Sequence, residues 1–167
     1  MDRAVTIRPA IAADADAIHA AIVRLGKALG QADKITSTAD DLRRFGFGSE
    51  PAFHGLIAEI DGTFTGVALF FPIFSTWLGR PGVFVQDLHV DEAFRGRGVG
   101  ERLIGEVARW SSARGGVYLR LSVDATNTRA QKFYERIGVS HRNGEREHGA
   151  YGDAFQALVR ANDRERP

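Results

Sequence analysis

Apolar residues near the N-terminus form a short run followed by a stretch of helical periodicity. Val5–Arg8 predicts a strand, and Pro9 is expected to end it because proline has no backbone N–H to donate. Ala12–Leu29 predicts a helix, since its apolar positions recur at intervals of three and four residues. Those positions are Ala17, Ile18, Ala21, Ile22 and Leu25. We therefore expect the chain to open with a strand and a helix.

The next part of the chain predicts a short helix and then a hairpin. The helix is expected to begin near Ser37 or Thr38, whose hydroxyl can cap it, and to end around Gly46. An Asp-Gly dipeptide between two apolar runs is a strong signal for the turn of a hairpin. The expected boundaries are Gly55–Ile60 for the first strand, Asp61-Gly62 for the turn and Phe64–Phe71 for the second strand, ended by Pro72.

The second half of the chain predicts strands that alternate with helices. After a loop over Ser75–Gly82, Val83–Val90 predicts a central strand, and a helix opens at Val99. The remaining elements are expected to be a strand at Val117–Val123, a helix at Asn127–Ile137 closed by Gly138, a last strand at Ala154–Val159 and a frayed tail from Ala161 to Pro167. This order predicts an α/β (α+β) fold, with a mixed sheet of six to seven strands and helices on both faces. Because no Pro- or Ser-rich linker divides the chain, we expect one domain over residues 1–167.

A glycine-rich segment, Arg95-Gly-Arg-Gly-Val-Gly100, joins the central strand to the helix at Val99. Three alternating glycines let backbone N–H groups approach a ligand closely, and the helix N-terminus adds further donors and a positive dipole end. The segment therefore predicts a phosphate-binding loop. It is no dinucleotide fingerprint, because Glu101 stands where the last glycine is required, and no Gly-Lys-Ser/Thr motif for a nucleoside triphosphate is present.

Composition narrows the classes of partner. The chain has 167 residues and a formal net charge of +1, which gives no general reason to expect nucleic acid or membrane binding. The absence of cysteine excludes disulfides, thiolate metal sites and a cysteine nucleophile, and the histidines show no metal-ligand spacing. With no apolar segment typical of a signal peptide or a membrane span, we expect a cytoplasmic protein that binds small molecules and no metal.

Two motifs resemble the GNAT superfamily of acyl-CoA-dependent N-acetyltransferases. The first, Arg/Gln-x-x-Gly-x-Gly/Ala, is matched by Arg95, Gly98 and Gly100. The second, Asn-x-x-Ala-x-x-Phe-Tyr, is matched by Asn127-Thr-Arg-Ala130 and Phe133-Tyr134. Each motif alone also fits a tight turn or the apolar stripe of a helix, but both occur here in the family's order.

Further runs resemble one branch of that superfamily, the spermidine/spermine and thialysine N-acetyltransferases. Thr76-Trp-Leu-Gly79 and Arg80-Pro-Gly82 make the thialysine type the more similar of the two. The resemblance implies the GNAT fold, acetyl-CoA as cosubstrate, a primary amine of a small molecule as acceptor, direct attack in a ternary complex, and a homodimer.

The resemblance also implies a set of site residues. Those carried over for acetyl-CoA are Leu88, His89 and Val90 on the central strand, Arg95, Gly96, Arg97, Gly98, Val99 and Gly100 in the loop, and Asn127, Ala130, Phe133 and Tyr134 in the second motif. Those carried over for the acceptor are Gln86, Asp87, Trp77 and Gln31. Tyr134 is expected to protonate the departing CoA thiolate, and Asp87 is the first candidate for the base.

The sequence departs from the branch where the amine would bind. The branch usually has Glu-Asp at the end of the central strand, whereas this chain has Gln86-Asp87, and an uncharged amide cannot take a proton. The base is therefore Asp87, His89, His54 acting through water, or water itself. Since other acidic positions of polyamine enzymes are also missing, we expect an acceptor less cationic than spermine. Two alternatives stay open: an acyl-CoA sensor without turnover, and an acetyltransferase that acts on a protein N-terminus, an amino acid or a drug-like amine.

Overall fold

The computed structural model describes residues 4–142, 144 and 148–163. The chain divides into two compact units, Met1–Ala130 and Gln131–Pro167, each of which is described by itself. The elements of the chain are β1 (Val5–Pro9), α1 (Ala15–Ala28), α2 (Ala39–Gly46), β2 (His54–Ile60), β3 (Thr63–Ser75), β4 (Arg80–Val90), α3 (Val99–Ser112), β5 (Leu119–Leu121), α4 (Thr128–Arg136) and α5 (Gly152–Asp163), with short 3₁₀ turns at Ala12–Asp14, Ala32–Lys34 and Glu92–Phe94. A single domain over the whole chain stays a prediction.

The sheet of the first unit has the strand order β1-β2-β3-β4-β5. All neighbours are antiparallel except β4 and β5, which run parallel. The predicted hairpin is confirmed: Ile60 pairs with Thr63, and the two turn residues, Asp61 and Gly62, have φ angles of 52° and 73°. Positive φ at both positions matches the twist of the flanking strands and explains the Asp-Gly dipeptide.

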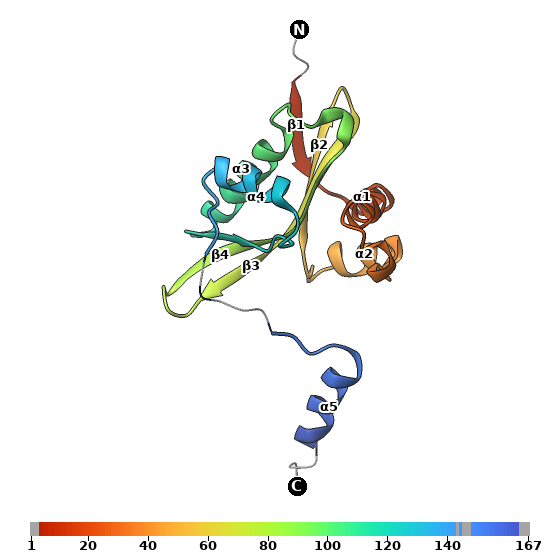
Figure 1. Cartoon of the computed structure of the whole chain (residues 1–167), viewed down its shortest axis with the longest axis vertical. Coiled ribbons are helices and arrows are strands. Elements are labelled where there is room, and N and C mark those ends of the chain that lie inside the picture. Colours follow the sequence, from red (N-terminus) through yellow and green to blue (C-terminus); the bar gives the residue numbers. More distant parts are fainter. Residues whose placement is uncertain (1–3, 143, 145–147, 164–167) are drawn as a thin grey trace. The chain divides into compact units, whose positions relative to one another are not determined.

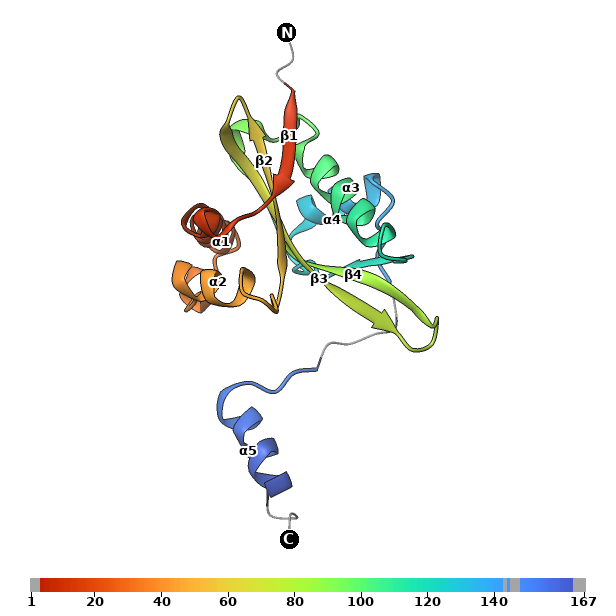
Figure 2. The ribbon, with the colours of Figure 1, turned by 180° about the vertical axis from the view of Figure 1, so that it is seen from behind.

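Helices cover both faces of the sheet, as the sequence predicted. Figures 1 and 2 show α1 and α2 on one face and α3 on the other. Side chains alternate along β3, so that Val67 and Leu69 pack in the core cluster with Ile18 of α1, whereas the Phe70 ring meets Trp110 of α3. The face of α3 that meets the sheet is fully buried, at Val99, Leu103 and Val107.

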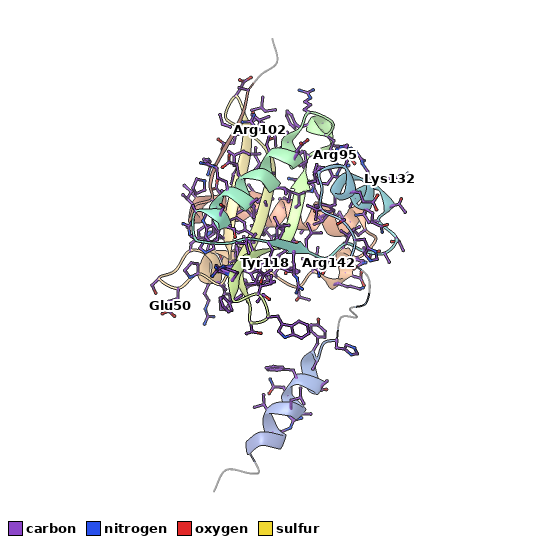
Figure 3. All side chains as sticks on the ribbon, turned by 90° about the vertical axis from the view of Figure 1, so that its left-hand side faces the viewer. Glu50, Arg95, Arg102, Tyr118, Lys132 and Arg142 are labelled. Carbon is purple, nitrogen blue, oxygen red and sulfur yellow. The ribbon has the colours of Figure 1, made fainter. Side chains whose placement is uncertain are left out.

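Close packing between β4 and the chain before β5 requires a glycine at position 82. A Cβ atom added to Gly82 would lie 2.6 Å from the ring of Tyr118, which is labelled in Figure 3. The backbone N–H of Val83 also donates to the carbonyl of Tyr118 at 3.0 Å. These contacts hold the middle of β4 against β5, which pairs with Val83, Phe84 and Val85.

The predicted course of the chain between residues 71 and 83 is wrong. Pro72 was expected to end a strand and Ser75–Gly82 to form a loop, but β3 continues to Ser75 and β4 begins at Arg80. Pairing of β2 with β3 begins at His54 opposite Phe70, so among the described strands β3 beyond that point pairs with β4 alone. A proline is tolerated there because a strand with one free edge does not need every N–H.

The predicted last strand is also wrong. Ala154–Val159 lies inside the helix α5 of the second unit, because Phe155, Leu158 and Val159 are spaced as on one face of a helix. The sheet of the described residues therefore has five strands and not the six to seven that were predicted. Within the predicted tail, α5 continues to Asp163, and residues 164–167 lie outside the described residues.

The start of α2 yields a test of the fold. Thr38 and Asp41 form a reciprocal cap, in which Thr38 Oγ1 accepts from the Asp41 N–H at 3.2 Å and Asp41 Oδ2 accepts from the Thr38 N–H at 2.8 Å. Replacing Thr38 with alanine should lower the free energy of unfolding by about 1 kcal/mol, measured by urea titration. Thr36→Ala is the control, because Thr36 is exposed just outside the helix. Equal effects of the two substitutions would contradict the assigned cap.

Candidate functional site

A bulge in β4 places two consecutive polar residues beside the same hollow. Asp87 pairs with Leu69, but Val85 pairs with the next residue of β3, Phe70, so Gln86 is the extra residue. In a regular strand, neighbouring side chains point to opposite faces, and a bulge removes that alternation locally. Both Gln86 and Asp87 consequently line a hollow of about 350 Å³.

The wall of this hollow is mainly apolar and comes from both helices and the sheet. Its lining consists of Ile22 from α1, Ser37 and Leu42 at and in α2, Ala52 and Phe53 before β2, Leu69 and Phe71 from β3, and Gln86 and Asp87 from β4. Gln86 and Ser37 are exposed, whereas Leu42 and Leu69 are buried. The hollow therefore combines an apolar interior with polar groups at a few positions, as small-molecule sites usually do.

Asp87 is a carboxylate without a partner among the described residues. Its side chain is half-buried, and it forms no hydrogen bond or ion pair with the part of the chain that the structure describes. Burial raises the pKa of Asp87 above its ordinary value of 3.8, because the charged form loses hydration. An unpaired carboxylate of this kind can receive an ammonium group or accept a proton.

The glycine loop has the backbone geometry of an anion site. Gly96 and Gly98 have φ angles of 76° and 75°, and Gly98 is the N-cap of α3. A Cβ atom at either glycine would meet nothing within 4 Å, so the space beside them is open. Within the described chain, the amide N–H groups of residues 96–101 have no acceptor. These free donors at a helix N-terminus fit a phosphate group.

Arg95 shapes this loop through contacts with the chain just before it. Its Nε donates to the Val90 carbonyl at 3.0 Å, and its Nη1 lies 3.0 Å from Glu92 Oε1. Arg97 instead lies over the ring of Phe94, with its guanidinium carbon 5.6 Å from the ring centroid. Figure 3 shows Arg95 in the turn before α3 and Arg102 on the helix itself. Arg95 thus holds the turn against the end of β4.

His89 links β4 to α1. It is 5% exposed, and its Nε2 lies 2.9 Å from Asp91 Oδ1, which also lies 3.2 Å from Arg24 Nε. Burial lowers the pKa of His89 below 6.5, although the hydrogen bond to Asp91 acts in the opposite direction. The ring is therefore neutral at pH 7 and donates to Asp91, which supports a structural role. Sequence reasoning missed this cluster, because nothing in the sequence indicated that Arg24 contacts Asp91.

His54 lies on the other face of the sheet from Asp87. Its ring centroid is 4.7 Å from that of Trp110 on α3, whereas Asp87 borders the hollow that α1 and α2 line. Burial lowers the pKa of His54, and the nearby Arg114 acts in the same direction. This position argues against His54 as the base.

The edge of β4 beyond the bulge is unpaired within the described residues. Pairing with β5 ends at Val85, whereas β3 stays paired with β4 on the other edge as far as Val90. Leu88 and Val90, which the resemblance assigns to acetyl-CoA binding, both lie in this segment. A strand edge that lacks a neighbour offers backbone donors and acceptors to a ligand.

The second motif begins at the cap of α4 and continues into that helix. Asn127 Oδ1 accepts from the Ala130 N–H at 3.1 Å, so Asn127 caps the helix as a side-chain acceptor. Phe133 and Tyr134 belong to the second unit, where their ring centroids are 5.0 Å apart. Their assignment to the site stays a prediction.

Two predicted acceptor residues do not line the hollow. Trp77 is 99% exposed in the turn between β3 and β4. Gln31 uses its side chain elsewhere: its Nε2 donates to Asp124 Oδ2 at 2.9 Å, and its Oε1 accepts from Lys34 Nζ at 3.4 Å. Their roles in acceptor binding stay predictions. Sequence reasoning missed most of the apolar wall, because residues such as Leu42 and Phe53 read as ordinary core or loop positions.

Comparison with known proteins gives the family. A model described as the acetyltransferase (GNAT) family matches residues 24–139. The chain belongs to this family. Its membership confirms the predicted class of enzyme, an N-acetyltransferase, and favours it over the sensor alternative.

Relatives of this GNAT chain support the predicted branch. Thialysine N-epsilon-acetyltransferase of Sus scrofa is 32% identical over 143 residues, which cover 81% of this chain and 84% of that protein. Spermidine/spermine N(1)-acetyltransferase-like protein 1 of Homo sapiens is 33% identical over 105 residues, which cover 59% of this chain and 15% of that protein.

A solved structure supports the GNAT fold. An integron cassette protein from the mobile metagenome of V. cholerae is 21% identical, with a TM-score of 0.77 over 93% of this chain and 97% of that one. In the described part of the chain, no helix is long and apolar enough to span a membrane.

The raised pKa of Asp87 makes a prediction about stability. Because the folded state favours the protonated carboxyl, this group stabilises the fold fully below the unfolded pKa of 3.8, and that contribution is lost as the pH rises through the folded pKa. Asp87→Asn should therefore raise the melting temperature at pH 7, and the gain should disappear near pH 3. Differential scanning calorimetry across this range checks both statements. Asp33→Asn, at an exposed position, should show no comparable gain; a lower melting temperature for Asp87→Asn at pH 7 would contradict the assignment.

Proposed function

We propose that this GNAT enzyme transfers the acetyl group of acetyl-CoA to the primary amine of a small molecule, by direct attack in a ternary complex. The observation that carries the proposal is the arrangement along β4. The bulge places Asp87 at an apolar hollow, and the strand leads through a short turn into the free amides of the glycine loop. One continuous segment thus supplies both an acceptor for ammonium and a site for phosphate.

The glycine loop fits the pyrophosphate of CoA. The free N–H groups of residues 96–101 would hold it, and Arg97 would add positive charge. The unpaired edge at Leu88 and Val90 would orient the acetyl carbonyl and stabilise the oxyanion that forms on it. Asn127, Ala130 and Phe133 of the second motif are proposed to contact the rest of the cofactor. Acetyl-CoA itself supplies the activated thioester.

The chain must also move protons. A primary amine has a pKa of about 10, so it reaches the site mostly as ammonium and must lose a proton before it attacks the thioester. Asp87 is the proposed base, acting directly or through water, because burial raises its pKa and no partner occupies it. Tyr134 is proposed to return a proton to the thiolate that leaves. His89 is already hydrogen-bonded to Asp91 and is proposed to position β4.

The acceptor is proposed to be less cationic than spermine. Gln86 replaces the glutamate of the branch, and Leu29 and Ser75 are uncharged where polyamine enzymes carry acidic groups. Each further ammonium would need its own carboxylate partner. A homodimer and a cytoplasmic location stay predictions from the sequence.

A first experiment tests the cofactor site by thermal shift. Gly98→Leu should abolish the rise in melting temperature that CoA produces, because the side chain would enter the open space beside the loop. The left-handed backbone also adds strain of roughly 1–2 kcal/mol. Gly115→Leu is the matched control, since Gly115 has a similar φ angle of 80° outside the loop and should keep the CoA response. If CoA raised the melting temperature of Gly98→Leu as much as that of the wild type, the glycine loop would not be the site that binds the CoA phosphates.

A second experiment tests the chemistry by following thiol release from acetyl-CoA over a panel of amines. Tyr134→Phe should lower kcat with little change in CoA affinity, because packing is kept and the acid is lost.

Asp87→Asn should lower activity most at the acidic end of the pH profile, where few amines are free of their proton. Wild-type rates in Asp87→Asn would transfer the base role to water. Absence of thiol release with every amine would overturn the proposed function.

A further inference from the structure

The lining of the hollow carries charge at one position. Among its described residues, Asp87 is ionisable, Ser37 and Gln86 are neutral and polar, and the rest are apolar. The polar groups of Ser37 and Gln86 are exposed. A ligand that enters the hollow therefore meets one carboxylate and, beyond it, hydrocarbon.

Acidic residues on the adjoining helices are already engaged. Asp40 lies 2.6 Å from Arg43, and Asp16 also pairs with Arg43. Asp41 is held in the cap of α2 by Thr38. None of these three carboxylates lines the hollow, so they do not supply a second anionic partner within it.

We infer that the acceptor is a primary amine with a compact apolar body and no second cationic group, a conclusion that rests on the function proposed above. Its ammonium group pairs with Asp87, and its hydrocarbon body contacts Ile22, Leu42, Phe53 and Phe71. A monoamine satisfies the carboxylate and buries apolar surface at the same time. The acceptor class thus differs from the polyamines named for one group of its relatives.

The energetic reason lies in the cost of an unpaired charge. A second ammonium against the apolar wall would lose hydration without gaining a carboxylate or another acceptor there. Replacing that ammonium by a methyl group removes the cost and adds apolar contact. The volume of about 350 Å³ lies at the lower end of ligand pockets, so the apolar body must be small.

Two amines of nearly equal shape separate this inference from its alternatives. Pentylamine and 1,4-diaminobutane differ in one terminal group, which is methyl in the first and ammonium in the second. Calorimetric titration of the CoA-bound protein with each amine measures binding without turnover. Pentylamine should bind at least about 10-fold more tightly, because an unpaired buried charge costs more than the 1.4 kcal/mol that this ratio represents.

A matched pair of variants tests the cause of the preference. Ala52 is an exposed residue of the lining, so Ala52→Glu adds a carboxylate at the mouth with little effect on the core. This variant should lower the ratio of the affinity for pentylamine to that for 1,4-diaminobutane several-fold. Ala52→Gln, whose side chain has the same size without the charge, should leave this ratio unchanged. Equal effects of the two variants would show that charge in the lining does not set the preference and would overturn the inference.

Thiol release with the same two amines distinguishes failure of the inference from failure of the proposed function. If 1,4-diaminobutane binds and reacts as well as pentylamine, the inference is wrong and the acetyltransfer reaction stands. If pentylamine binds preferentially but no thiol is released with any amine, the proposed reaction is wrong and the preference of the hollow stands. If neither amine binds the CoA-bound protein, the hollow is not the acceptor site and the inference is overturned.

Discussion

The site depends on the register shift between β3 and β4. Without the extra residue Gln86, Asp87 would alternate with its neighbours in the ordinary way, and the strand would present one polar side chain to the hollow instead of two. The same shift coincides with the point where β4 stops pairing with β5, directly after Val85. One local irregularity therefore accompanies both the placement of the carboxylate and the opening of a backbone edge. The contact of Gly82 with Tyr118 holds the strand in place just before this point.

The carboxylate proposed to act on substrate is a group whose burial costs stability. Burial raises the pKa of Asp87, because its charged form loses hydration in an apolar setting without a partner among the described residues. The amides of the glycine loop likewise lack acceptors in the described chain. The buried face of α3, with Leu103 and Val107 in contact with the sheet, supplies the compensating apolar burial. Arg95 and the His89–Asp91 pair add polar links at the end of β4. Stability thus comes from the core around the site, while the groups at the site remain available to ligands.

Local chemistry explains which parts of the fold were predictable from sequence. The Asp61-Gly62 turn and the cap of α2 depend on residues a few positions apart. The turn was predicted correctly, and of the two candidates for the cap, Ser37 and Thr38, the structure has Thr38. The continuation of β3 past Pro72 depends on where β2 begins, which no local pattern reveals. At Ala154–Val159 the short apolar run was assigned to a strand, although its spacing of three and four also fits the observed helix.

The candidate site shows the same division between local and long-range information. The glycine loop was recognisable because its residues are contiguous, and Asp87 was recognisable by resemblance. The apolar wall was not, since residues such as Leu42 and Phe53 are distant from β4 in sequence and meet it only through the sheet and α2. The pairing of Gln31 with Asp124 joins positions 93 residues apart and had no signal in the sequence.

The identity of the bulge residue connects the resemblance to the geometry. In the branch that this chain resembles, glutamate usually occupies the position of Gln86, next to the aspartate. Two adjacent carboxylates at one hollow repel each other when both are ionised, and cationic groups of the acceptor relieve that repulsion. With glutamine there, Asp87 can ionise beside a neutral neighbour, and a single ammonium is enough to neutralise it. The amide of Gln86 still offers hydrogen bonds, but it contributes no charge. Under the proposed function, a single residue at the bulge thus sets the number of positive charges that the hollow favours, while the rest of the β4 strand and the glycine loop keep the roles proposed for them.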